Sequence, residues 1–453
     1  MVKSPLPVLA NDTISGGALG QWWSEESDGR ILCQLCPRAC RLKPGDRGFC
    51  FVRLNRDGKM VLETYGRSSG FCIDPIEKKP LNHFLPGTPV LSFGTAGCNL
   101  GCKFCQNWDI SKSREVSRVS EIAAPFDIAQ EALRWGCRSV AFTYNDPVIW
   151  AEYAIDTAKA CHEIGIRTVA VTAGYLTDIA RQDFFSRMDA ANIDLKAFTE
   201  NFYYKLTGAH LSPVLDTIRH AVRETDCWVE LTNLIIPDAN DNPDELKRMI
   251  GWILDEVGCD VPVHFTAFHP DFRMRDVPAT SHETLAMAYD MARQAGLNFV
   301  YVGNVHDVPR QSTYCPSCRK RVIERDWHQI GVYDLQEDRC RHCNYRLPGL
   351  FEASPGDWGR RRQPISIGSS HSVSKNEHIA PQITSTTQTG PNMDIDNQIP
   401  VLGSDQLESI HRAACHLVAA AVQNRSADVT QELGPLADQL VAGIFVTLKR
   451  GNT

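Results

Sequence analysis

The chain has 453 residues, more than one typical domain, so we expect a large catalytic domain with further parts attached. Its formal net charge of −7 does not favour binding to nucleic acid or to an anionic membrane. No stretch approaches the roughly 20 apolar residues that a membrane span needs. Residues 1–23 carry no secretion signal, and 17 cysteines in such a chain indicate metal binding instead of disulfides, so we expect a cytoplasmic metalloprotein.

The first cysteines along the chain are Cys33, Cys36, Cys40 and Cys50, which we call the N-terminal cysteine group. Four thiolates are enough for a structural zinc ion or for an auxiliary [4Fe–4S] cluster, and the spacing leaves both open. We assign residues 1–30 to an N-terminal tail and residues 31–82 to a Cys-rich segment.

The next group, Cys98, Cys102 and Cys105, has the spacing Cys-x3-Cys-x2-Cys and is called the triad below. Three thiolates on one short loop hold three irons of a [4Fe–4S] cluster, whereas ordinary electron-transfer clusters take a fourth cysteine. This spacing is typical of radical S-adenosylmethionine (radical SAM) enzymes, in which the open iron binds the cofactor and one electron cleaves it to a 5′-deoxyadenosyl radical. A zinc knuckle or buried structural cysteines are the alternative, but zinc knuckles usually come as two Cys-x2-Cys pairs.

Short apolar runs alternate with amphipathic stretches between Val90 and Asn304, which predicts a parallel sheet in a partial or complete β/α barrel; we assign this core to residues 83–304. The predicted strands are Val90–Thr95, Ser139–Tyr144, Thr168–Thr172, Ala191–Lys196, Trp228–Ile236, Pro262–Ala267 and Asn298–Val302. The predicted helices are Asp127–Trp135, Val148–Ile164, Asp178–Arg187, Val214–Glu224, Pro243–Val257 and His282–Ala295.

Four residues at the ends of predicted strands are candidates for binding S-adenosylmethionine. Asp146 precedes a proline, where other radical SAM enzymes hold the methionine ammonium with a glutamate. Gly174 lets backbone approach a ligand. Asp194 and Lys196 alternate on one strand face and can hold a zwitterion, although a structural salt bridge is the alternative. The sequence does not identify a catalytic residue.

The last cysteine set is Cys315, Cys318, Cys340 and Cys343, here the C-terminal cysteine group. Two Cys-x2-Cys pairs predict a zinc ribbon over residues 312–350, with rubredoxin-like iron as the minor alternative. The composition changes after Phe351, and residues 366–400 are rich in Ser, Thr, Gln, Asn and Pro, so residues 351–403 are predicted to be a disordered linker. Residues 404–453 then show one helical and one strand-like pattern, a short α/β tail.

Several strings resemble one family, the AmmeMemoRadiSam system radical SAM enzymes, which are related to the pyruvate formate-lyase activating enzymes. They are Asp74-Pro-Ile-Glu-Lys-Lys-Pro-Leu81, Gly97-Cys-Asn-Leu-Gly-Cys-Lys-Phe-Cys-Gln-Asn-Trp108, Phe142-Thr-Tyr-Asn-Asp-Pro147, Asn192-Ile-Asp-Leu-Lys-Ala-Phe198, Val302-Gly-Asn304 and Thr313-Tyr-Cys-Pro-Ser-Cys318. The resemblance implies a [4Fe–4S] cluster, S-adenosylmethionine, a reductant such as flavodoxin or ferredoxin, and AMMECR-type and Memo-type partner proteins. Residues 404–453 resemble the opening helix and strand of an AMMECR-type domain, which predicts a truncated fusion; an unrelated amphipathic helix docked on the barrel is the alternative.

The leading hypothesis is a radical SAM enzyme that abstracts hydrogen from an unknown substrate or partner protein. A glycyl-radical enzyme activase is the runner-up, since such activases share the triad and the Asp-x-Lys strand end. A nucleic-acid-binding zinc-ribbon protein is a third class, disfavoured by the acidic charge and by the triad.

Overall fold

The computed structural model describes residues 13–14, 17–112 and 121–367, all within the first of two compact units, residues 1–373. The predicted tail at 404–453 and most of the predicted linker lie outside the described residues. Within the described part of the chain, no helix is long and apolar enough to cross a membrane.

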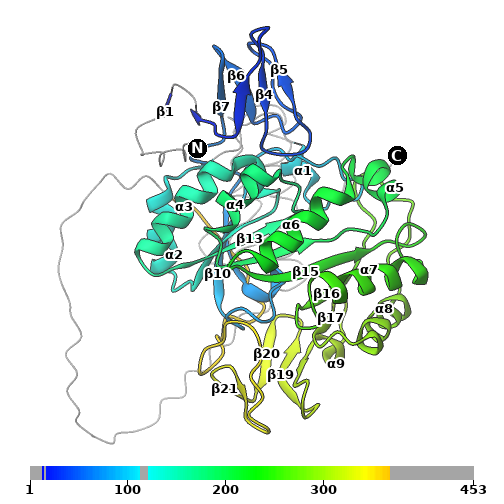
Figure 1. Ribbon diagram of the computed structural model, residues 1–453. Coiled ribbons are helices and arrows are strands. Elements are labelled where there is room, and N and C mark those ends of the chain that lie inside the picture. The colour runs from blue at the N-terminus through cyan, green and yellow to red at the C-terminus, as the bar shows by residue number, and fades with distance from the viewer. Residues whose placement is uncertain (1–12, 15–16, 113–120, 368–453) are drawn as a thin grey trace, which may run out of the picture. The chain divides into compact units, whose positions relative to one another are not determined.

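A sheet with seven parallel strands in chain order forms the centre of this unit (Figure 1), which confirms the mostly parallel α/β fold. Every predicted core strand overlaps an observed one. The strands are β10 (Pro89–Phe93), β12 (Ser139–Phe142), β13 (Arg167–Thr172), β14 (Ala190–Asp194), β15 (Trp228–Ile235), β16 (Val263–Ala267) and β17 (Val300–Gly303). The strand order is linear from β17 to β10 among the described strands, so the barrel is a partial one.

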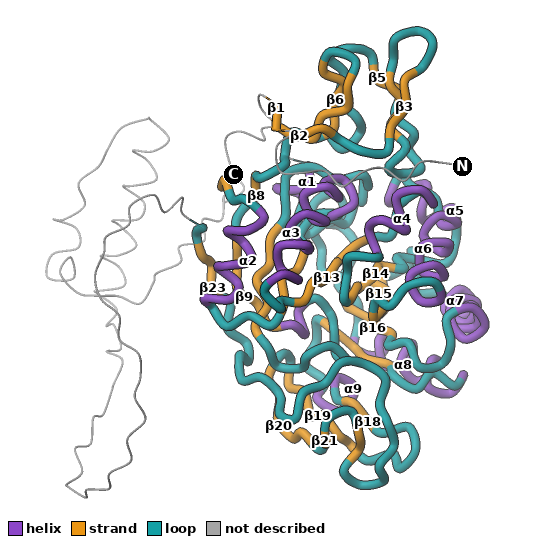
Figure 2. Tube along the Cα trace, turned by 60° about the vertical axis from the view of Figure 1, so that its left-hand side comes forward, coloured by secondary structure: helices purple, strands orange, loops and turns teal. Residues whose placement is uncertain are grey.

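Helices connect successive parallel strands and lie along the sheet (Figures 1 and 2), as right-handed crossovers require. The long ones are α2 (Pro125–Arg134), α3 (Ala151–Glu163), α4 (Asp178–Phe185), α6 (Leu211–Arg223), α7 (Pro243–Glu256) and α8 (His282–Ala295). Shorter turns are η1 (Ile76–Lys78), α1 (Trp108–Ser111), η2 (Pro147–Trp150), α5 (Glu200–Phe202), the π-helical η3 (Tyr203–Thr207) and α9 (Val308–Gln311). A large apolar core lies between the helices and the sheet.

Two antiparallel strands extend the sheet beyond β10, and neither was predicted. Strand β9 (Phe71–Pro75) pairs with β10, with Pro75 opposite Pro89, and β23 (Gln363–Ile365) pairs with β9. The boundaries predicted at residues 82 and 351 therefore differ from the structure, because part of the Cys-rich segment and part of the linker belong to the central sheet. Such short strands are stabilised by their neighbours more than by their own propensity.

An N-terminal module of two small sheets lies at one end of the barrel in Figures 1 and 2. One sheet contains β1 (Thr13–Ile14), β2 (Gly17–Leu19), β6 (Arg53–Arg56) and β7 (Lys59–Leu62), and the other contains β3 (Trp23–Glu25), β4 (Ile31–Cys33) and β5 (Arg41–Leu42). The tail predicted for residues 1–30 thus contributes strands to this module. Strands β8 (Arg67–Ser68) and β11 (Glu121–Ile122) pair with each other in an antiparallel two-stranded sheet.

A C-terminal module lies at the opposite end in both views. Its strands are β18 (Thr313–Tyr314), β19 (Arg321–Asp326), β20 (Gln329–Tyr333), β21 (Leu335–Gln336) and β22 (Arg339–Cys340). A separate apolar cluster attaches it to the barrel through Phe299 and Tyr301. His83 joins the two parts, because its ring nitrogens lie 2.7 Å from the Pro348 carbonyl oxygen and 2.7 Å from the Tyr301 hydroxyl.

Candidate active site and metal centres

A cavity of about 320 Å³ runs from the carboxyl ends of the parallel strands into the partial barrel. The triad loop follows β10, and the ends of β12, β13 and β14 supply further polar groups, because parallel strands bring their carboxyl ends to one edge. The lining residues of interest are Lys78, Cys98, Cys102, Cys105, Tyr144, Asn145, Asp146, Asp194, Lys196, Thr266 and Asn304.

Asn145 holds the start of the triad loop against the end of β12. Its Nδ2 donates to the Gly97 carbonyl oxygen at 2.8 Å and to Thr95 Oγ1 at 3.2 Å, with the Ala96 carbonyl oxygen at 3.4 Å. Its Oδ1 accepts from the Thr95 amide at 3.1 Å and from Trp150 Nε1 at 3.2 Å. Asn145 is buried, so these hydrogen bonds replace solvent and fix the loop that carries the cysteines.

Backbone contacts hold the other side of the loop. The amides of Gly101 and Lys103 donate to the carbonyl oxygens of Thr207 and Leu206 at 2.7 and 2.9 Å. Lys112 Nζ donates to the Leu100 carbonyl oxygen at 2.8 Å. The loop is therefore clamped between β12 and η3.

The triad thiols lie among backbone donors and beside a cation. Burial raises the pKa of Cys98 to about 11 and that of Cys102 to about 12, although Lys196 opposes the shift at Cys102. The Leu100 amide donates to Cys98 Sγ at 3.4 Å, and Ser111 Oγ lies 3.2 Å from Cys105 Sγ. Buried thiols with backbone donors and a nearby cation fit thiolate ligation, because metal binding displaces their protons. A cluster therefore fits this loop.

The structure places Asp146 at the cavity, but its carboxylate already has three partners. Oδ1 accepts from Thr172 Oγ1 at 2.8 Å and from the Val148 amide at 3.1 Å, and Oδ2 accepts from the Ala173 amide at 3.1 Å. Burial raises the pKa of Asp146, and these hydrogen bonds oppose that shift. Asp146 therefore ties the end of β12 to the end of β13 beside the cavity.

Gly174 is not among the residues that line the cavity within the described chain. It has φ = +65°, and a Cβ there would lie 3.0 Å from Ile193 Cγ2. Its glycine is needed for this turn, and the cavity wall at the end of β13 consists of Val171, Thr172 and Ala173 instead.

Asp194 and Lys196 meet as an ion pair at the cavity wall, with Lys196 Nζ 2.8 Å from Asp194 Oδ2. Burial alone would lower the pKa of Lys196, but Asp194 and the Cys102 sulfur raise it. Lys196 is therefore a permanent cation beside the triad, which can pair with an anionic group of a bound molecule.

Lys78 and Tyr144 also line this cavity, and sequence reasoning missed them. Lys78 Nζ lies 2.9 Å from Asp74 Oδ1, and the Tyr144 hydroxyl donates to Asp74 Oδ2 at 2.9 Å. Burial lowers the pKa of the neighbouring Lys79 to about 8, despite its ion pair with Asp74 at 2.7 Å. Asp74 and Tyr144 occur in two of the strings that resemble the family, but only the fold brings those strings together.

A second chamber of about 190 Å³ adjoins the first, since Lys78, Pro80, Thr266 and Asn304 line both. Its far wall belongs to the C-terminal module and contains Arg325, Trp327 and His328.

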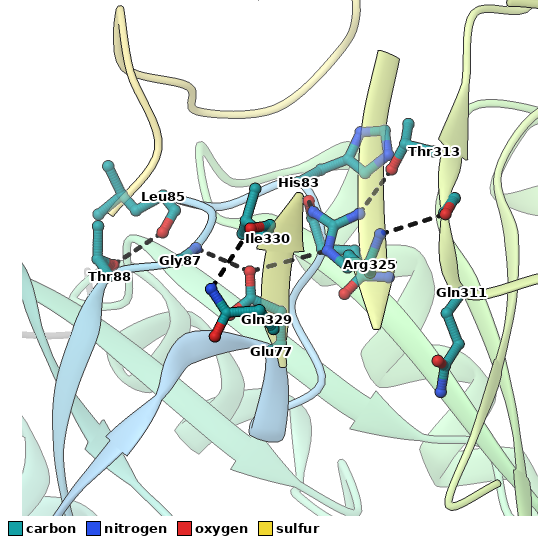
Figure 3. A network of polar contacts seen from close by, with 12 residues as sticks. Glu77, His83, Leu85, Gly87, Thr88, Gln311, Thr313, Arg325, Gln329 and Ile330 are labelled. Carbon is teal, nitrogen blue, oxygen red and sulfur yellow. Dashed lines mark hydrogen bonds and ion pairs between the residues drawn. The ribbon is translucent and has the colours of Figure 1, made fainter. Parts of the chain in front are cut away.

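Arg325 fixes that wall to the barrel, as Figure 3 shows. Its Nη1 donates to Thr313 Oγ1 at 2.8 Å, its Nη2 donates to the Asn82 carbonyl oxygen at 2.7 Å, and Nε lies 3.8 Å from Glu77 Oε1. Glu77 Oε1 in turn accepts from the Gly87 amide at 2.8 Å. The C-terminal module therefore forms part of the cavity wall.

The four thiols of the C-terminal cysteine group all lie within 4.8 Å of one another. Cys315 Sγ is 3.5 Å from Cys343 Sγ, and Cys318 Sγ is 3.8 Å from Cys340 Sγ. Four sulfurs about 2.3 Å from one tetrahedral ion are about 3.8 Å apart, so this group has the size of a single-ion site.

The N-terminal cysteine group lies against the triad loop. A Cβ built on Gly97, which has φ = +86°, would overlap the carbonyl oxygen of Cys50. Arg38 Nε donates to the carbonyl oxygen of Asn99, next to Cys98, and Arg38 Nη2 donates to that of Gly208 at 2.7 Å. The two cysteine sets are therefore adjacent.

Comparison with known proteins gives matches that differ in how much of the chain they cover. The sequence profile of the radical SAM superfamily matches residues 93–253. An uncharacterized protein from Methanocaldococcus jannaschii is 39% identical over 328 residues, which cover 72% of this chain and 97% of that protein. The pyruvate formate-lyase-activating enzyme of Clostridium pasteurianum is 23% identical over 211 residues, which cover 44% of this chain and 87% of that protein. A solved domain of the pyruvate-formate lyase-activating enzyme from Bacteroides vulgatus has a TM-score of 0.33 and 17% identity, covering 37% of this chain and 99% of that domain.

Proposed function

This chain is a radical SAM enzyme, related to the pyruvate formate-lyase activating enzymes, and from that premise we propose that it belongs to the AmmeMemoRadiSam system and acts on a substrate held between the triad and the C-terminal module. The superfamily implies a [4Fe–4S] cluster and S-adenosylmethionine, which when bound supply a 5′-deoxyadenosyl radical that abstracts hydrogen. The observation that carries the proposal is that the triad, Asp194 and Lys196 face one cavity.

In this proposal Cys98, Cys102 and Cys105 hold three irons, and the Asp194–Lys196 pair holds the charged groups of the cofactor. Lys196 pairs with an anionic group and Asp194 with a cationic one, because the two charges lie side by side. Asp146 orients the strand ends by its three hydrogen bonds and offers its remaining lone pairs to the cofactor ammonium.

The second chamber has room for the substrate, since it adjoins the first and is lined by groups that the triad and the ion pair do not use. We place zinc at the C-terminal cysteine group, because its sulfur separations match a tetrahedral ion. Zinc there stabilises the module whose Arg325 and Trp327 form the chamber wall.

The experiment is anaerobic reconstitution of the full chain followed by iron counting and an assay for 5′-deoxyadenosine. Cys98→Ala, Cys102→Ala and Cys105→Ala are each expected to abolish cleavage of S-adenosylmethionine, because each removes the protein ligand of one iron. Cys259→Ala is the matched control, since Cys259 is exposed and away from the cavity. Full cleavage by a triad variant would refute the proposal.

A glycyl-radical enzyme activase is the second candidate, favoured by relatives whose names are those of activating enzymes. It predicts a neighbouring gene for a glycyl-radical enzyme and a glycyl radical signal when the two proteins are mixed. The AmmeMemoRadiSam assignment predicts neighbouring genes for AMMECR-type and Memo-type proteins and co-purification with them. An electron donor such as flavodoxin or ferredoxin is part of either proposal.

We also propose, from family resemblance alone, that residues 404–453 are the start of an AMMECR-type domain. This proposal predicts that a chain ending after Ile367 retains cofactor cleavage. A chain shortened from residue 366 onward does not test the tail alone, because it also removes Ile367, which is buried in the barrel core directly after β23 ends at Ile365.

A further inference from the structure

The N-terminal cysteine group forms a compact buried cluster in the N-terminal module. Cys33 ends β4 and its amide donates to the Cys40 carbonyl oxygen at 2.9 Å, which closes the hairpin that carries Cys36. Gly48 lies between the other two sulfurs, since a Cβ there would be 3.7 Å from Cys50 Sγ and 3.8 Å from Cys40 Sγ. Cys33, Cys36 and Cys50 are all at most 9% exposed and Cys40 is partly buried, so the group is largely shielded from solvent.

Backbone hydrogen bonds fix the loops of the N-terminal cysteine group. The Ala39 amide donates to the Cys36 carbonyl oxygen at 3.1 Å, and the Phe51 amide donates to the Gly48 carbonyl oxygen at 2.9 Å. These hydrogen bonds hold the turns that carry the thiols.

Arg53 supplies a buried cation at the same place. Its Nη1 donates to both carboxylate oxygens of Glu152, at 2.9 and 2.8 Å, while Arg53 Nε has no hydrogen-bond partner within the described residues. The buried Nε–H of Arg53 is therefore a free donor in the same module, and a thiolate-bound centre carries net negative charge that such a donor can stabilise.

The spacing of the sulfurs distinguishes the kinds of centre. Among the described residues, the thiols of the C-terminal group gather into a set of the size of one metal ion, whereas the N-terminal group does not. The triad, which lies within the part of the chain that matches the radical SAM superfamily, does not form such a set either. A cube of four irons spaces its thiolates more widely than one tetrahedral ion does.

We propose that Cys33, Cys36, Cys40 and Cys50 bind a second [4Fe–4S] cluster, adjacent to the triad loop. Four thiolates ligate all four irons, so this cluster has no open iron and does not bind S-adenosylmethionine. Arg38 and the Cys50 carbonyl connect its loops directly to the triad loop. This site goes beyond the proposed function and does not depend on the radical reaction.

The test uses the full chain with all three triad cysteines changed to alanine, reconstituted anaerobically with iron and sulfide. We expect about four irons and four sulfides to remain per chain, and about eight irons in the wild type. After reduction, the electron paramagnetic resonance signal of the triple variant is expected to be unchanged by S-adenosylmethionine. These readouts require no cofactor cleavage, so they succeed or fail independently of the proposed function.

Adding Cys36→Ser to the triple variant is expected to remove the remaining iron, while adding Cys259→Ser, an exposed cysteine, is expected to retain it. A circular dichroism melt checks that each variant is folded. A wild type with about four irons and two zinc ions would overturn the proposal in favour of zinc. Four irons that persist after Cys36→Ser would overturn the ligand assignment.

Discussion

Replacing Asn145 by aspartate is expected to release the triad loop while keeping the shape of the side chain. The introduced carboxylate retains the two acceptor contacts with the Thr95 amide and Trp150 Nε1. It loses every donation from Nδ2 and brings a negative oxygen against the Gly97 carbonyl oxygen, where the donor distance is 2.8 Å.

The size of the effect follows from the number of bonds lost. Each buried hydrogen bond contributes about 1 kcal/mol, and a buried carbonyl left without a donor costs about 1–3 kcal/mol. Loss of the bonds to Gly97 and Thr95 therefore amounts to about 3 kcal/mol, which shifts the closed loop toward an open one by more than about 100-fold. Burial also raises the pKa of the introduced carboxyl, so mild acid is expected to restore one donor and part of the effect.

The assay is the iron retained per chain against increasing chelator under anaerobic conditions, followed by the rate of 5′-deoxyadenosine formation. Asn192→Asp is the matched control, because Asn192 is buried in β14 and its Nδ2 donates to the Pro80 carbonyl oxygen at 2.8 Å without touching the triad loop. Both variants are expected to lose stability, and only Asn145→Asp is expected to lose iron. Iron retention and turnover equal to the wild type at neutral pH would refute this account of the loop.

Lys196→Ala is expected to weaken S-adenosylmethionine binding by at least about 10-fold with little change in iron content, measured by equilibrium binding; unchanged affinity would make the pair with Asp194 purely structural. Gly97→Ala is expected to prevent iron loading because its Cβ overlaps a carbonyl oxygen at a positive φ, whereas Gly101→Ala, with the nearest atom 3.4 Å from its Cβ, is expected to load normally. For His83, burial lowers the pKa to about 4 despite Glu230, so the folded state binds fewer protons than the unfolded state, whose histidine pKa is about 6.5. Stability is therefore lost as the pH falls from about 6.5 to about 4, and His83→Gln is expected to reduce the change in melting temperature over that window; an unchanged slope would show that other groups cause it.

The parallel strands and their helices were predictable because each is a local pattern of apolar residues with its own turn signals. Strands β9 and β23 were not, since β23 contains only Gln363, Pro364 and Ile365 and exists by pairing with β9. Its sequence has no alternation to detect. A strand that forms only by pairing with residues more than 250 positions away has no local sequence pattern that predicts it.

The same distinction applies to the site. The triad was predictable because its chemistry lies in the spacing of three cysteines on one loop. Asn145 was not identified because its role depends on where the triad loop returns in space, although a polar residue directly after a predicted strand is a usable signal. Strand alternation predicted that Asp194 and Lys196 lie on one face, and both line the cavity. The place of Lys78 in the cavity wall was not predictable, because it depends on β9, which was itself not predicted.

The close approach of Gly97 to Cys50 bears on the order in which the two cysteine groups fold and take up metal. Ribosomal synthesis delivers the N-terminal cysteines before the triad, so the segment with Cys50 and Arg38 is available to fold before the triad loop packs against it. If the N-terminal segment takes up its metal first, its folded surface is already in place when the triad loop packs against it. We therefore expect maturation to be sequential, with the proposed cluster of the N-terminal cysteine group inserted before the cluster proposed for the triad.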